Sequence, residues 1–167
     1  MKTTYLLCAA LAVVAMAASS CGDPVHANAV TALGPEAAGV REGPTHRPGQ
    51  PCTVCHSGSG PGSPVWSIAG TVYDAPGSST PAEGATVKIL DSAGKSIELI
   101  TNGVGNFYVE QAQFAPVFPL TGVSVEAPGR EQKFMSSLVN GTGGCAECHV
   151  GSGSVGKMPA VYLGARK

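Results

Sequence analysis

The chain has 167 residues, and its ten lysines and arginines nearly balance eleven aspartates and glutamates, giving a formal net charge of −1 at pH 7. This balance argues against nucleic acid or an anionic membrane surface as the partner. Glycine (23 residues) and proline (13) are abundant and aromatic residues make up only 5%, which favours short strands and tight turns over helices.

The N-terminal segment has the features of an export signal. Lys2 supplies a positive charge, and an apolar run follows from Tyr5 to Ala18. A helix that spans a bilayer needs about 20 apolar residues. The shorter run therefore predicts a signal peptide over residues 1–20 and argues against a membrane anchor, and we expect an exported protein.

Two cleavage sites for the signal peptide are possible after this run. Ala15 and Ala17 suit an ordinary signal peptidase, which would release a secreted or periplasmic protein. The stretch "AASSCG" instead resembles the bacterial lipoprotein box, in which small residues precede a cysteine that receives lipid. The resemblance implies that Cys21 is lipidated, and that the protein is a periplasmic or outer-membrane lipoprotein of a bacterium held to the membrane by its lipid alone.

Residues 21–50 show no hydrophobic period of 2 or 3.6 and are rich in alanine, glycine and proline. Such a composition is typical of a linker, so we expect a tether that begins at Cys21. No stretch after the signal peptide predicts a convincing helix.

Residues 65–140 predict an antiparallel β-sandwich, and hence an all-β fold class. "VWSIAGTVYD" from Val65 alternates apolar and polar residues, and so does "ATVKILD", where Val87 and Ile89 share one face. "NGVGN" is a strong turn signal, in which Gly105 allows the hairpin and Phe107 then enters the core. The pattern gives about six or seven short strands at a spacing of about 10–12 residues, as in sandwich folds.

This stretch resembles the carboxypeptidase regulatory-like (transthyretin-like) domain, an Ig-like sandwich, from about Ile68 to Val139. In that family the domain is a structural or binding unit without catalysis of its own, and the resemblance implies the same here. The matching positions are Gly70, Gly84, Ala85, Val87, Thr101, Gly105 and Phe107.

The sequence Cys-x-x-Cys-His occurs on both sides of the predicted sandwich, in a loop at 51–64 and in a segment at 141–167. It is the attachment sequence of c-type haem. Its two thiols bond covalently to the porphyrin edge, and its histidine binds the iron as proximal ligand. We therefore expect two haem c groups. One would be held by Cys52, Cys55 and His56, and the other by Cys145, Cys148 and His149.

Three other interpretations of these cysteines stay open. A Cys₄ zinc site could be built from two Cys-x-x-Cys knuckles, but it would not require a histidine after each. A redox-active dithiol usually occurs in a βαβ context, which the sequence lacks. Structural disulfides are the third possibility in an oxidising compartment.

The distal ligand of each haem is less well defined. Bis-histidine ligation would use His46, six residues before the first motif, and His26, which otherwise would be an exposed histidine of the tether. Met158 follows the second motif closely and is an alternative ligand, whereas Met135 lies on a predicted strand and is expected in the core. An open iron site would bind ligands rather than carry electrons.

The sequence contains no catalytic triad, no paired acid and base, and no phosphate-binding loop. The glycines near the motifs are expected to give haem-flanking loops freedom. We therefore expect a carrier of single electrons, not an enzyme, whose partners are redox proteins such as other cytochromes. The alternatives are a cell-surface binding or structural module with haem as a sensor or ligand-binding site, and a zinc-stabilised adhesion module.

Overall fold

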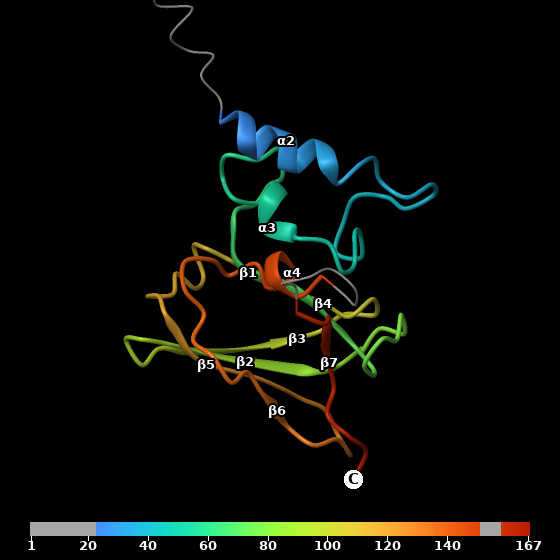
Figure 1. Ribbon diagram of the computed structural model, residues 1–167, viewed down its shortest axis with the longest axis vertical. Helices are drawn as coiled ribbons and strands as arrows, with labels where there is room; N and C mark the ends of the chain where they lie inside the picture. The colour runs from blue at the N-terminus through green and yellow to red at the C-terminus, as the bar shows by residue number, and fades with distance from the viewer. Residues whose placement is uncertain (1–22, 151–157) are drawn as a thin grey trace, which may run out of the picture.

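Two β-sheets pack against each other to form the body of the protein in a computed structural model, which describes residues 23–150 and 158–167 (Figure 1). The predicted signal peptide and Cys21 lie outside the described residues. The first sheet has the strand order β4-β1-β7, and the second has the order β3-β2-β5-β6. This arrangement confirms the predicted all-β, sandwich-like fold. None of the helices in the described part has the length and apolar character needed to cross a membrane.

The first sheet centres on β1, Trp66–Tyr73, which pairs antiparallel with β4, Asn106–Glu110, and parallel with β7, Val161–Tyr162. The second contains β3, Ser96–Ile100, then β2, Thr86–Asp91, then β5, Leu120–Glu126, and finally β6, Lys133–Phe134, all antiparallel. β6 ends before Met135, so this residue follows the strand on which it was expected to lie. The sequence also gave no sign of β7, through which the chain returns to the first sheet after the second motif.

The core forms as the alternation predicts, because Val87 and Ile89 of β2 both face the first sheet and are only 3% and 2% exposed. Phe107 of β4 is 2% exposed and enters the same core. The turn before it requires Gly105, whose φ is +78° and whose position leaves no room for a Cβ beside the carbonyl oxygen of Val72.

The region predicted as an unstructured tether contains helix α2, Pro24–Ala32, so the expectation of no helix after the signal peptide is wrong. The Asp23 side chain caps the helix by accepting a hydrogen bond of 2.9 Å from the backbone N–H of Val25. Proline at the first helical position is favourable because it has no N–H to satisfy. The helix buries none of its residues completely, which explains why it has no hydrophobic period.

The end of the predicted tether is bound to the sandwich. Arg47 forms an ion pair of 2.9 Å with Glu36, which folds the segment onto itself. The backbone N–H of Gly49 donates to Oγ1 of Thr71 on β1 at 2.7 Å, and the Asn106 amide donates to the backbone carbonyl of His46 at 3.0 Å. His46 is therefore held in place against the first sheet.

Candidate functional site: two Cys-x-x-Cys-His turns on one strand

The first motif forms a single helical turn, α3, Cys52–Cys55, which ends at His56. The His56 imidazole is only 6% exposed, and its Nδ1 lies 2.8 Å from the backbone carbonyl oxygen of Pro64. A carbonyl oxygen can only accept, so Nδ1 must carry the proton. The lone pair of the imidazole is then on Nε2, the arrangement that a metal-binding histidine requires.

An aromatic stack fixes the plane of the His56 ring. The indole of Trp66 lies parallel to it, with ring centroids 3.7 Å apart and an interplanar angle of 4°. Tyr108 stacks in turn on Trp66 at 4.5 Å. On Gly62, a Cβ would lie 2.8 Å from the His56 ring, so this glycine allows close approach. The expectation that glycines near the motifs give the loop freedom is wrong at this position.

The second motif repeats the local design of the first. It forms the helical turn α4, Cys145–Cys148, which ends at His149. Nδ1 of His149 lies 2.6 Å from the carbonyl oxygen of Pro159, so this imidazole also has its proton on Nδ1 and a lone pair on Nε2. Two motifs far apart in the sequence thus orient their histidines with the same kind of partner, a prolyl carbonyl.

The two turns lie next to each other, and both contact β1 (Figure 1). The Thr53 hydroxyl of the first motif donates a hydrogen bond to the Glu147 carboxylate of the second. Gly143 and Gly144 precede Cys145 where a side chain would collide with the backbone of Ser67 on β1 and with the Thr53 side chain. Sequence reasoning identified each motif but could not predict that they meet.

The four thiols of the motifs are free; those of Cys52, Cys55 and Cys145 are half-buried, and that of Cys148 is exposed. Burial raises the pKa of the Cys52 thiol to about 11 and that of the Cys145 thiol to about 12. Both thiols therefore stay protonated at neutral pH, which disfavours the redox-dithiol interpretation because that chemistry needs a thiolate. Within residues 23–150 and 158–167, no three Cys, His, Asp or Glu side chains are grouped as ligands of one metal ion.

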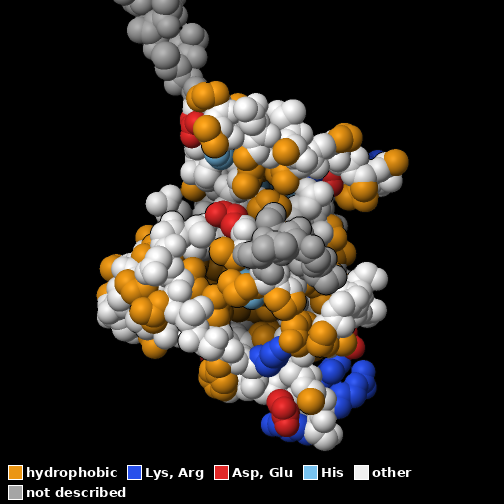
Figure 2. All heavy atoms as spheres, viewed as in Figure 1, with side chains coloured by type: hydrophobic (Ala, Val, Ile, Leu, Met, Phe, Trp, Pro, Cys, Tyr) orange, Lys and Arg blue, Asp and Glu red, His pale blue; other side chains and the backbone are white. Residues whose placement is uncertain are grey.

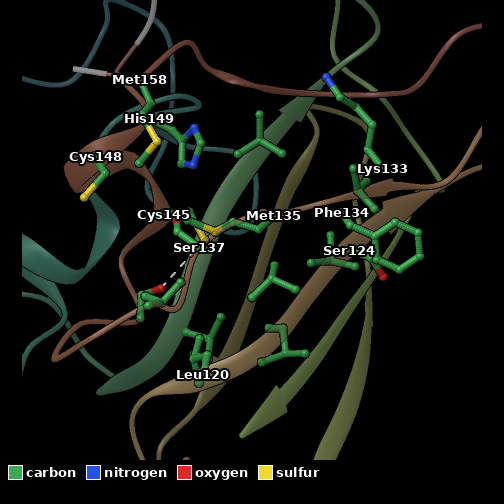
Figure 3. A pocket seen from close by; sticks show the side chains of 18 of the residues that line it. Leu120, Ser124, Lys133, Phe134, Met135, Ser137, Cys145, Cys148, His149 and Met158 are labelled. Atoms are coloured by element: carbon green, nitrogen blue, oxygen red, sulfur yellow. Dashed lines mark hydrogen bonds between the residues drawn. The ribbon is translucent and has the colours of Figure 1, made fainter. Parts of the chain in front are cut away.

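The second motif opens on a cavity of about 320 Å³ between the two sheets (Figure 3). Cys145, Cys148 and His149 all line it, and of the two thiols that of Cys145 is half-buried while that of Cys148 is exposed. The rest of the lining is mostly apolar and comes from both sheets. Figure 2 shows hydrophobic side chains gathered on this middle part of the surface, while lysines and arginines gather near the C-terminus. A volume of this size lies at the lower end of the roughly 300–1,000 Å³ typical of small-molecule sites.

His46, the expected distal ligand, lies close to the first motif. Its ring centroid is 6.1 Å from that of His56. Two imidazoles that share one metal ion through bonds of about 2 Å have ring centres about 6 Å apart. Nδ1 of His46, however, accepts a hydrogen bond of 3.2 Å from the backbone N–H of Gly43, which places the proton on Nε2. Ligation through Nε2 therefore requires this hydrogen bond to break.

The other two expected ligands lie elsewhere. His26, on α2, is half-buried, and its Nε2 is buried without a hydrogen-bond partner, so it is not the exposed tether histidine of the alternative interpretation. It lines a second cavity, of about 420 Å³, together with Thr53 of the first motif. Met158 lies beside the second motif, where its backbone N–H donates to the carbonyl of Cys148 at 3.0 Å.

Comparisons with known proteins found no match to a protein family, to a curated protein or to a solved structure.

Proposed function

We propose that the protein is an exported c-type cytochrome that carries two covalently attached haems and transfers single electrons at the periplasmic or outer cell surface. The observation that carries the proposal is the matched orientation of His56 and His149. Each has its Nδ1 directed at a prolyl carbonyl and keeps the lone pair of Nε2 for a metal.

The residues present fit haem c. In each motif one helical turn separates two free thiols and is followed at once by the oriented imidazole. Attachment needs no oxidant, because a thiol adds across a vinyl double bond of the porphyrin, with sulfur bonding to one carbon and hydrogen to the other. A haem held by these residues would supply one-electron chemistry between the ferrous and ferric states of its iron.

The chain's own residues would hold and tune these groups. The Pro64 carbonyl and the Trp66 indole fix the rotation of His56 on two sides, which preserves one ligand orientation. The sandwich, which we propose is a carboxypeptidase regulatory-like scaffold, supports both motifs through β1. Export and a lipid on Cys21 would place this carrier beside membrane-bound or extracellular redox partners, such as other cytochromes.

The test is to express the full chain in a bacterium that attaches haem c and to count its haem. A pyridine haemochrome spectrum, a denaturing gel stained for haem and an intact mass should together give two covalent haems per chain. The paired change of Cys52 and Cys55 to serine should remove one, and so should the paired change of Cys145 and Cys148. A colourless protein, or one that keeps its haem in either double variant, would contradict the proposal.

A further inference from the structure

The cavity beside the second motif contains two methionines, and they lie on different sides of it. Met158 and Met135 both line the cavity with Cys145, Cys148 and His149. No histidine of the described chain other than His149 lines it. Lys133 and Tyr162 also line it, but these two side chains lie against each other, with Nζ of Lys133 3.2 Å from the centre of the Tyr162 ring. Of the remaining described walls, the side chains best suited to be a sixth iron ligand are the thioethers, and a thioether is a common partner of histidine in c-type haem.

Met158 is held on the side of the second motif itself. Its backbone N–H donates to the carbonyl of Cys148, and the next residue, Pro159, accepts the hydrogen bond from Nδ1 of His149. Figure 3 shows the Met158 side chain beside the His149 ring. Nδ1 points away from the metal that Nε2 would bind. Met158 is next to Pro159, the partner of Nδ1, so its backbone is anchored on the proximal side of that metal. A distal ligand must approach the iron from the opposite side.

Met135 approaches from the other sheet. It follows β6, and its backbone N–H donates to the carbonyl of Val123 on β5 at 2.9 Å. It is half-buried, and Figure 3 shows its side chain extending into the cavity toward Cys145. Its thioether therefore enters the cavity beside the second motif. It comes from the second sheet, which is a different wall from the one that the motif forms. The sequence pattern predicts a core position for Met135, whereas the structure leaves it half-buried at the cavity wall.

We infer that Met135 is the distal ligand of the haem bound at Cys145, Cys148 and His149, and that Met158 is not. The inference rests on the proposed function and adds the ligand set of its second site. It gives the sandwich a direct part in that site, because strand β6 positions the ligand. Thioether ligation raises the potential of a haem relative to two imidazoles. The second haem is therefore the more easily reduced of the two if the first has two histidines.

The experiment compares Met135→Leu with Met158→Leu in the full-length, haem-loaded protein. Leucine conserves most of the volume of methionine, so both variants should fold. Met135→Leu should turn one haem high-spin, let it bind carbon monoxide, remove the weak red absorption of a ferric iron–thioether bond and lower one midpoint potential. Met158→Leu should leave all four properties unchanged.

Met135→His supplies a second and independent readout. It should keep the haem low-spin and closed to carbon monoxide, yet it should lose the thioether absorption. Two attached haems with an unaltered spectrum in Met135→Leu, or loss of the thioether absorption in Met158→Leu, would overturn the inference while leaving the proposed function intact. Absence of covalent haem from the wild-type protein would instead refute the proposed function itself.

Discussion

Gly70→Ala tests whether β1 supports the second motif by close contact. A Cβ at this buried position would lie 2.8 Å from Cβ of Cys145 and 2.8 Å from Cζ of Phe107. Neither atom can move freely, since Phe107 is 2% exposed in the core and Cys145 begins helix α4. Inserting a methyl group into such packing costs about 1–3 kcal/mol. Alanine also stabilises the folded protein by about 0.4–1 kcal/mol relative to glycine, because it reduces the conformational entropy of the unfolded chain.

Gly103→Ala is the matched control. Its nearest neighbour would be a Glu83 carboxylate oxygen at 3.7 Å, and its backbone is not left-handed, so alanine fits without strain. Both variants reduce the entropy of the unfolded chain equally, so the difference between their melting temperatures measures the steric clash alone. Gly70→Ala should unfold about 2–12 °C below Gly103→Ala, at about 2–4 °C per kcal/mol. Thermal unfolding followed by circular dichroism measures this difference, and equal midpoints would refute the packing argument.

Three further outcomes are expected. Cys21→Ala should move the protein from the membrane fraction to the soluble fraction with its haem content unchanged, and a variant that still sediments would contradict lipidation. His46→Ala should turn one haem high-spin and let it bind carbon monoxide, whereas two unaltered low-spin signals in electron paramagnetic resonance would exclude His46 as a ligand. Asp91 is buried at 1% exposure, and hydrogen bonds from three backbone N–H groups, that of Val117 foremost, lower the pKa of its carboxyl. Its stabilisation is therefore present above the unfolded pKa of about 3.9 and is lost as pH falls through the lower folded pKa, so Asp91→Asn should reduce the melting temperature at pH 7 and flatten its decline in acid.

Local pattern was enough to predict the longer strands of the sandwich, β1 to β5, but neither the shortness of β6 nor the presence of β7. Alternation placed Val87 and Ile89 inside because a pleated strand directs every second side chain to one face. The turn at Gly105 could be predicted because few residues adopt its backbone conformation. Helix α2 was missed since it packs without burying a residue completely, and its signal was limited to the Asp-Pro pair that caps it.

Only part of the candidate site could be predicted from the sequence, because prediction depends on residues that are neighbours in the chain. Cys-x-x-Cys-His is a contiguous motif, so its residues could be identified without a structure. The partners of those residues are distant in the chain or belong to irregular loops. Trp66 was assigned to a strand but not to the His56 ring, and Thr53 could not be paired with Glu147 before the two turns were known to meet. Met135 shows the same limit, because only the packing of two sheets brings it to the second motif.

The two glycines before Cys145 offer a way to recognise distant relatives of this protein. Any side chain at Gly143 would strike β1, and any side chain at Gly144 would strike the first motif. A homologue can diverge at most surface positions, but one that keeps the two turns together has little freedom here. We expect the second motif of such homologues to have the sequence Gly-Gly-Cys-x-x-Cys-His, and the first motif to precede the sandwich. A search with this spaced pattern should find members of the lineage that overall similarity does not reveal, and relatives with bulky residues at both glycines should have separated their motifs.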